Sequence, residues 1–144
     1  MEIREYQDGD MQSVRQNPFQ DAVKDYPELP IPAHTYTCIF EGEIVAVGGI
    51  KMYFEGVGES WIIMTKQSKK HDIYGLIACR AIEKKLNELM VELNIRQCIA
   101  HVRADFSIAI RFAEALGFKY KCEIEFWFPD LVSAILYSKT KANI

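Results

Sequence analysis

The chain has 144 residues, 49% of them hydrophobic and 26% charged, which is enough apolar material to build the core of one compact domain spanning residues 1–144. A formal net charge of −3 argues against a general affinity for nucleic acid or for anionic membranes. No apolar run approaches the roughly 18 residues of a membrane span, and the N-terminus lacks the apolar segment of a signal peptide, so we expect an intracellular rather than a secreted protein.

The four cysteines are scattered along the chain and form no Cys-x-x-Cys pair. Each stands among apolar residues, so buried free thiols are a better interpretation than a metal site. The three histidines, His34, His71 and His101, also lack the spacing of metal ligands. We therefore expect no metal centre.

The first 32 residues alternate short regular elements with irregular ones. Residues 2–6 are typical of a strand, and Asp10 is a suitable N-cap for a helix through Met11 and Val14. Four prolines interrupt residues 17–32, so we expect a loop there, with one helical turn near residues 21–24.

The next segment predicts three consecutive antiparallel strands. Apolar runs at residues 35–40 and 44–53, separated by a Glu-Gly-Glu turn, are typical of a hairpin. A Gly-rich turn then leads into a third strand over residues 60–64. The adjacent glycines Gly48 and Gly49 inside the second strand indicate a bulge or a close approach of another backbone.

A polar stretch leads into the longest predicted helix. Its apolar residues recur every three or four positions from Ile73 to Leu93, with charged residues opposite them. Asp72 is a suitable N-cap, and Asn94 ends the helix. Residues 97–102 follow as the next strand.

Residues 105–128 predict a short helix, a glycine stop and a long strand. The apolar residues of this helix fall on one stripe, and Gly117 follows the last of them, where a helix end requires a positive φ. The stripe consists of Ile108, Phe112, Ala115 and Leu116.

Beyond Gly117 the apolar period changes to two. Cys122, Ile124 and Phe126 should therefore be buried on one face of a strand, with Glu123 and Glu125 exposed on the other. We expect Pro129 to end this strand. Residues 134–137 should form the last strand, and residues 139–144 should be a fraying tail.

The helix ending Leu-Gly-Phe and the Lys-rich strand after it resemble the last conserved block of the GNAT (Gcn5-related N-acetyltransferase) superfamily, Asn-x-x-Ala-x-x-x-Tyr-x-x-x-Gly-Phe. Ala109, Gly117 and Phe118 match this block, whereas Phe106 stands at its Asn position and Ala113 at its Tyr position. The predicted order of elements resembles the GNAT fold over nearly the whole chain. The resemblance implies an α/β (α+β) protein with a mixed, mostly antiparallel central sheet of about six to seven strands flanked by helices.

In the family, the strand before the long helix diverges from its neighbour and pairs with the pantetheine arm of acetyl-CoA, and a Gly-rich loop receives the pyrophosphate. Here no register of residues 67–75 restores both glycines, and Asp72 adds negative charge. The lysines of this segment are either a replacement for the phosphate cradle or part of a solvated turn. The resemblance therefore implies that acetyl-CoA binds more weakly than about 0.1 mM or not at all. The cofactor-binding candidates are Ile62, Ile63, Met64, Lys69, Lys70 and Tyr74.

The resemblance also implies a proton donor and a proton acceptor. Nothing replaces the tyrosine of the family block, because Ala113 occupies its place. Glu59 at the start of the fourth strand and His101 in the fifth are the candidate catalytic bases. Each has a structural alternative, as a turn carboxylate and as a strand histidine with satisfied hydrogen bonds.

A more diffuse resemblance, over about residues 44–128, is to GNAT-like proteins of short-tailed bacteriophages, which include a small internal virion protein. It rests on Gly48-Gly49, the segment 61–65, a Lys-rich helix entry and the segment 110–112. It implies a bacteriophage protein located in the host cytoplasm or packaged in the virion.

Two functions follow from these resemblances. One is an acetyl-CoA-dependent N-acetyltransferase acting on an amine of a small molecule or protein. The other, which we favour on sequence, is a non-catalytic binding or virion-associated protein with a degenerate acetyl-CoA site, because the departures fall on functional positions. Trp61, beside a turn, and Trp127, on the outward side of a strand, predict a surface for a protein partner or a second copy, unless residues 131–137 cover them.

Overall fold

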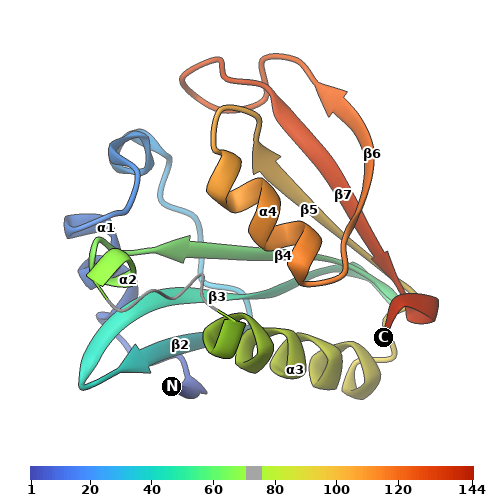
Figure 1. Cartoon of the computed structure of the whole chain (residues 1–144), viewed down its shortest axis with the longest axis horizontal. Helices are drawn as coiled ribbons and strands as arrows, with labels where there is room; N and C mark the ends of the chain where they lie inside the picture. The colour runs from blue at the N-terminus through green and yellow to red at the C-terminus, as the bar shows by residue number, and fades with distance from the viewer. Residues whose placement is uncertain (71–75) are drawn as a thin grey trace.

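The structure, a computed structural model, describes residues 1–70 and 76–144, so the sequence predictions for His71, Asp72, Ile73 and Tyr74 lie outside the described residues. The described strands form one seven-stranded sheet in the order β1-β2-β3-β4-β5-β7-β6 (Figure 1). All neighbours are antiparallel except β4 and β5, which are parallel. The mixed, mostly antiparallel sheet with flanking helices is therefore confirmed. The strands are β1 (Glu2–Glu5), β2 (His34–Phe40), β3 (Glu43–Phe54), β4 (Val57–Met64), β5 (Gln97–Arg103), β6 (Lys119–Ile124) and β7 (Ala134–Thr140).

The predicted helices lie between these strands in the predicted order, and the short helices α2 and η2 were not predicted. The long helix ends as expected, because Asn94 follows it with a φ of 52°. Among the described residues, no helix is both long and apolar enough to cross a membrane. The elements are α1 (Asp10–Gln16), η1 (Asp21–Asp25), α2 (Gln67–Lys70), α3 (Leu76–Glu92), α4 (Ser107–Ala115) and η2 (Lys141–Asn143).

The predicted hairpins β2-β3 and β3-β4 are present, and the paired glycines of β3 explain how closely these strands approach. A Cβ atom on Gly49 would collide with the carbonyl group of His34 on β2, and one on Gly48 would collide with the carbonyl group of Trp61 on β4. The glycines are therefore required by close backbone approach on both sides of β3, and no register shift occurs at either of them.

Helices α3 and α4 cover the same face of the sheet, in front in Figure 1, and the main core lies beneath them. Cys38 of β2 belongs to this core, whereas its neighbour Thr37 points to the other face, where it contacts Asp10 of α1. The sheet thus separates an α3/α4 face from an α1 face. The core residues from the two helices and the C-cap of α4 include Leu86, Leu89, Met90, Phe112, Ala113 and Leu116.

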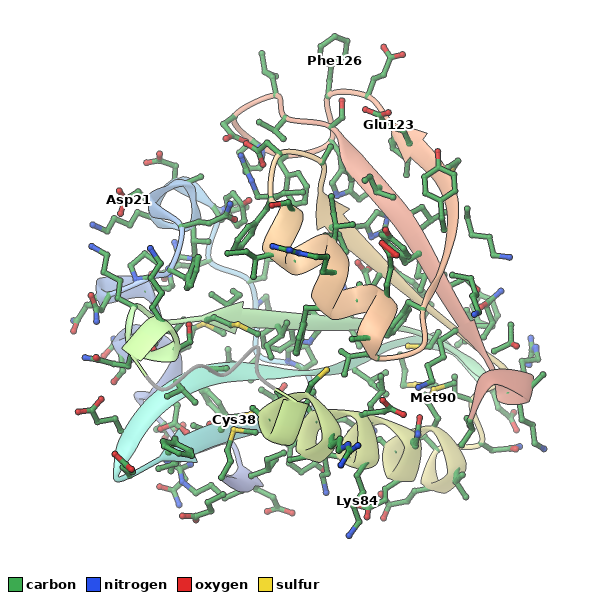
Figure 2. All side chains as sticks on the ribbon, in the orientation of Figure 1. Asp21, Cys38, Lys84, Met90, Glu123 and Phe126 are labelled. Atoms are coloured by element: carbon green, nitrogen blue, oxygen red, sulfur yellow. The ribbon has the colours of Figure 1, made fainter. Side chains whose placement is uncertain are left out.

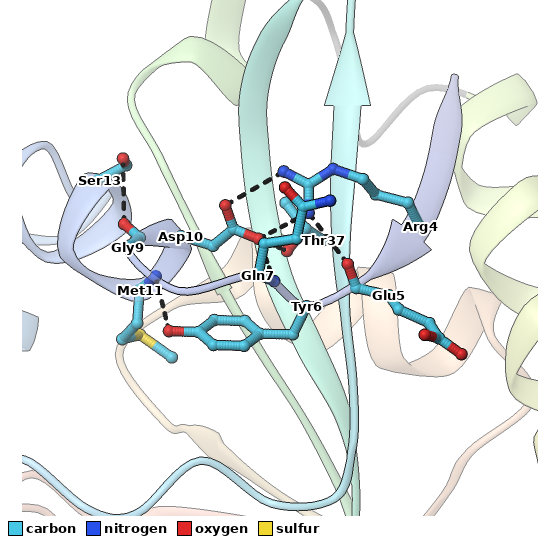
Figure 3. Close-up of polar contacts among 9 residues, drawn as sticks. All are labelled: Arg4, Glu5, Tyr6, Gln7, Gly9, Asp10, Met11, Ser13 and Thr37. Atoms are coloured by element: carbon cyan, nitrogen blue, oxygen red, sulfur yellow. Dashed lines mark hydrogen bonds and ion pairs between the residues drawn. The ribbon is translucent and has the colours of Figure 1, made fainter.

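Asp10 anchors α1 to the sheet and is not its N-cap; Gly9, with φ 93°, takes that position. The buried carboxylate accepts hydrogen bonds from Arg4 at 2.8 and 3.1 Å, from the Gln7 amide at 2.9 Å and from the Thr37 hydroxyl at 2.6 Å (Figure 3). Burial works to raise the pKa of Asp10, but the hydrogen bonds from Arg4 and Thr37 outweigh it and leave the pKa lowered. The sequence suggested only a helix cap, because the contacts of Asp10 with Arg4 on β1 and Thr37 on β2 depend on how these strands pair.

The glycine stop after α4 is confirmed, since Gly117 has a φ of 96°. Phe112 and Leu116 are buried as predicted, but Ala115 is exposed and Ala113 is buried in its place. The helix is rotated slightly from the predicted stripe because its buried side faces both the sheet and the cavity described below.

The predicted burial of the following strand is wrong. Cys122 is exposed, Ile124 is only half-buried, and Phe126 is 71% exposed at the outer margin of the molecule near Glu123 (Figure 2). Glu123 and Glu125 are exposed as predicted. Two features explain the error: β6 is the last strand of the sheet, and its register against β7 shifts between Tyr120 and Cys122, which changes the side-chain parity.

The strand also ends earlier than predicted, at Ile124, and Phe126 turns the chain with a φ of 54° well before the proline. The expected fraying tail is wrong as well. Lys139 lies inside β7 with 0% exposure, and its ammonium group donates a hydrogen bond of 2.6 Å to the carbonyl oxygen of Leu116. That carbonyl is at the C-terminal end of α4, where the helix leaves acceptors without intrahelical partners.

Candidate active site

The two parallel strands at the centre of the sheet separate after a short contact. β4 pairs with β5 only from Val57 to Glu59, opposite Gln97 to Ile99, although β4 continues along β3 to Met64. Figure 1 shows the two strands diverging toward their C-terminal ends. A cavity of about 240 Å³ occupies this gap and is lined by side chains from both faces of the sheet. The predicted divergence of the strand before the long helix is thus present.

One backbone segment of β4 borders this gap. The backbone N–H of Thr65 donates a hydrogen bond of 3.0 Å to the carbonyl of Val45 on β3. In an antiparallel pair only every second residue bonds to the same neighbour, so the N–H and C=O of Ile63 also point toward β3. The backbone groups of the residues between them point away from β3. The N–H and C=O of Ile62 therefore face the gap, where no described strand pairs with them. The carbonyl of Met64 faces the same way but accepts a 2.8 Å bond from the amide of Phe19.

All three predicted β4 residues, Ile62, Ile63 and Met64, line the cavity. They differ in what they can offer a ligand, because only Ile62 combines a gap-facing N–H with a gap-facing C=O that has no partner in the described residues. Trp61 lines the cavity too, and its buried indole N–H has no hydrogen-bond partner in the described part of the chain.

The structure brings together the two candidate bases. Glu59 is the last β4 residue paired with β5, and its Oε2 lies 2.5 Å from Nδ1 of His101 on β5. Both side chains are largely buried, at 22% and 10% exposure. Tyr53 of β3 donates its hydroxyl hydrogen bond to the other carboxylate oxygen, and Trp127 stacks on the His101 ring at 4.3 Å with an interplanar angle of 6°.

The protonation of this group follows from its contacts. Burial works to raise the pKa of Glu59, but hydrogen bonds from His101 and Tyr53 lower it overall, so the carboxylate is ionised. Burial, together with the hydrogen bond to Glu59, raises the pKa of Tyr53 to about 12, so this residue is a donor. Because an ionised carboxylate only accepts, the short contact requires a proton on Nδ1 of His101, which leaves the lone pair of a neutral ring on Nε2.

Arg103, at the end of β5, joins the loops around the cavity. Its guanidinium donates to Asp130 at 2.7 and 3.0 Å, to Asp105 at 3.1 Å and to the Tyr26 hydroxyl at 2.8 Å. Tyr26 in turn stacks on Phe128 with ring centroids 5.8 Å apart. One buried cation thus ties together the loop before β2, the loop before α4 and the loop between β6 and β7.

The phosphate end of the predicted cofactor site is less complete. Lys69 lies on α2 with its ammonium group 4.5 Å from the centre of the Phe19 ring, while the Lys70 side chain and Tyr74 lie outside the described residues. Ser68 is fully buried and donates its hydroxyl hydrogen bond to the Thr65 carbonyl. The described residues therefore fit a pantetheine-like chain in the gap and show no preformed phosphate cradle.

The two positions that depart from the family block also line the cavity. Phe106 stacks on Phe19 with ring centroids 5.2 Å apart, which joins the start of α4 to the loop after α1. Ala113 is 6% exposed and presents only a methyl group. Among the described residues, Ala113 at the tyrosine position of the family block therefore supplies no hydroxyl group.

Sequence reasoning missed Tyr53, Arg103 and the stacking of Trp127 on His101. Tyr53 stands on the polar side of a strand end, and an arginine that ends a strand is unremarkable in the sequence, so neither carries a local signal. The predicted interface role of the tryptophans stays a prediction. Trp61 lines the cavity, whereas Trp127 remains 49% exposed.

Comparisons with known proteins identify the fold. No family model matches the chain, and no curated protein sequence matches it. Ard1 from Thermoplasma volcanium has a similar structure, with a TM-score of 0.73 and 19% identity over 96% of each chain. The acetyltransferase (GNAT family) from Bacillus anthracis has a TM-score of 0.73 and 18% identity, covering 97% of this chain and 94% of its own.

A third structure is yncA, a putative acetyltransferase from Salmonella typhimurium with its cofactor acetyl-CoA; its TM-score is 0.61 and its identity 10%, over 74% of this chain and 63% of its own. At these identities the likeness establishes architecture alone. The chain has the GNAT fold. These structures give no support to the resemblance to bacteriophage virion proteins.

Proposed function

We propose that this protein is an acetyl-CoA-dependent N-acyltransferase in which His101, oriented by Glu59, accepts the proton of the acceptor amine. The contact of 2.5 Å between Glu59 and His101 carries the proposal, because it joins two strands at the point where they separate around the cavity. A buried carboxylate that holds one ring nitrogen leaves the other as a base, which is the arrangement of a general base and its orienting group.

Each residue of the site then has a defined role. Acetyl-CoA would supply the activated acyl group, and the gap-facing N–H and C=O of Ile62 would hold its pantetheine chain as a strand partner. Nε2 of His101 takes up the proton of the attacking amine, and the Glu59 carboxylate stabilises the resulting imidazolium. Trp127 shields one face of the imidazole from water.

A non-catalytic binding protein is the second candidate, and Ala113 favours it. A buried alanine at the tyrosine position provides no proton donor for a leaving thiolate. At the phosphate end, Lys69 already contacts Phe19, and the loop sequence does not provide both glycines of the family pattern. We therefore expect acetyl-CoA to bind more weakly than about 0.1 mM under either proposal. A virion-associated role belongs to this second candidate.

The test combines binding with turnover. Titration calorimetry measures acetyl-CoA affinity, and mass spectrometry measures acetylation of a panel of polyamines, amino sugars and peptide N-termini at saturating cofactor. The variants are His101→Gln, Glu59→Gln and, as a matched control, His34→Gln, since His34 lies on β2 and does not line the cavity. We expect His101→Gln to lower kcat/KM by roughly 100-fold to 10,000-fold and His34→Gln to leave it unchanged.

Full activity of His101→Gln would refute the assignment of the base. Cofactor binding without transfer to any amine of the panel would favour the binding protein. Product should be detected by mass rather than with a thiol reagent, because the exposed Cys122 would react with such a reagent.

A further inference from the structure

The outer edge of β6 is an unused strand edge. β7 pairs with the inner edge of β6, and no strand in residues 1–70 or 76–144 pairs with the outer one. The β6 side chains from Lys119 to Glu123 are all exposed, including Tyr120 at 61%. Its outward-facing N–H and C=O groups are therefore available to another strand.

The charges along this edge are arranged symmetrically. In the sequence Lys119 and Lys121 precede Cys122, and Glu123 and Glu125 follow it, with Glu125 one residue beyond the end of β6. None of these four side chains is in an ion pair within the described part of the chain. Reversing the strand direction exchanges the two halves, which makes the segment complementary to a reversed copy of itself.

We propose that a second copy of this chain docks on the outer edge of β6, by antiparallel pairing of the two β6 strands about a two-fold axis at Cys122. In this register Lys121 lies opposite Glu123 of the partner subunit on either side of the axis. The contact between Lys121 and Glu123 of the partner subunit occurs twice by symmetry, Cys122 meets its own copy on the axis, and the two sheets become one continuous sheet.

The same charges argue against an edge strand that is protected from pairing with a second copy. Lysines on an edge strand normally prevent pairing, since two copies would bring like charges together. Here Lys121 has Glu123 at the symmetric position, so antiparallel pairing brings opposite charges together and a parallel pairing in register would not. The register shift between Tyr120 and Cys122 leaves Lys121 without a partner on β7 and, together with the end of β6 at Ile124, limits pairing to a few residues beside Cys122. The dimer should therefore be weak, with a dissociation constant in the micromolar range, roughly 1–100 µM.

The first test is sedimentation equilibrium across about 5–200 µM protein, a range that brackets this affinity. Lys121→Glu brings two pairs of glutamates together and should weaken dimerisation by at least about tenfold. The double variant Lys121→Glu/Glu123→Lys restores complementarity and should return the dissociation constant to within about threefold of the original. Lys84→Glu, on an exposed position of α3, is the matched control and should change nothing.

The second test uses Cys122, which the proposed axis places opposite Cys122 of the partner subunit. Directly opposed residues of an antiparallel pair have Cα atoms about 4.5–5.5 Å apart, which a disulfide can bridge. Diamide should therefore produce a disulfide-linked dimer, taking up the two protons and two electrons that the two thiols release. Cys122→Ser should abolish the cross-link, Lys121→Glu should slow it, and the charge-swap variant should restore its rate.

A chain that stays monomeric at every concentration would overturn the proposal. So would a dimer whose affinity is the same in Lys121→Glu and in the unsubstituted chain. Circular dichroism and a urea titration of each variant confirm that the fold is intact, which is expected because all the substituted side chains are exposed.

Discussion

Replacing Asp10 with asparagine tests how α1 is attached to the sheet. The carboxylate, 7% exposed, accepts two hydrogen bonds from Arg4 and one each from Gln7 and Thr37. Asparagine keeps the shape but replaces one accepting oxygen with a donating NH₂ group, so at least one bond to a charged partner is lost, at about 1.5–3 kcal/mol.

Arg4 is 23% exposed and can recover some hydration, which places the expected loss at about 2 kcal/mol rather than at the upper end. Urea titration at pH 7, followed by tryptophan fluorescence, measures the free energy of unfolding. Asp8→Asn is the matched control, because Asp8 is an exposed carboxylate two residues away, and it should change stability by less than about 0.5 kcal/mol.

The pH dependence gives an independent check. The folded-state pKa of Asp10 is lowered, so the unfolded chain binds its proton more readily than the folded chain does. The contribution of Asp10 is therefore complete above about pH 4 and is lost as the pH falls through the lower folded-state pKa. A difference between the original chain and Asp10→Asn that is as large at pH 3 as at pH 7, or one below about 0.5 kcal/mol at pH 7, would refute the reasoning.

Two further predictions concern the core and the thiols. Phe112 is 6% exposed on the buried side of α4, so Phe112→Ala should destabilise the fold by about 3–5 kcal/mol in a urea titration, and a change below about 1 kcal/mol would mean that this face is misassigned. After reduction, the folded chain should show one rapidly reacting thiol and the chain in urea four, because only Cys122 is exposed while burial raises the pKa values of Cys38, Cys79 and Cys98. Cys122→Ser should remove the rapid phase, and a rapid phase that persists in that variant would contradict the burial of the other three.

Local sequence signals determined the elements and most of their ends. The hairpin turn at Gly42, the end of α3 at Asn94 and the end of α4 at Gly117 all have the positive φ that these residue types adopt at low cost. The order of elements followed from hydrophobic period and turn residues, and the resemblance to the GNAT block came from Ala109, Gly117 and Phe118. These properties depend on a residue and its near neighbours in the chain, so they can be predicted from a single sequence.

The position of β6 in the sheet could not be predicted in this way. An alternating pattern shows that a strand has two different sides, but burial requires another element to cover one of them. β6 lies at the end of the sheet, and the register shift at Lys121 changes its parity, so Cys122 and Phe126 are exposed despite their apolar pattern. The burial of Lys139 likewise depends on the end of α4, 23 residues earlier in the chain.

The same distinction between local and long-range information applies to the candidate site. The sequence identified Glu59 and His101 as separate candidate bases, because an acidic residue and a histidine in strands are visible singly. Their contact spans 42 residues and exists because α3 returns the chain to place β5 parallel to β4, with the strands separating directly after Glu59. The sequence by itself therefore determined which residues are available for chemistry, and the tertiary structure decided which of them meet, because contacts between distant residues depend on how strands pair and not on local preference.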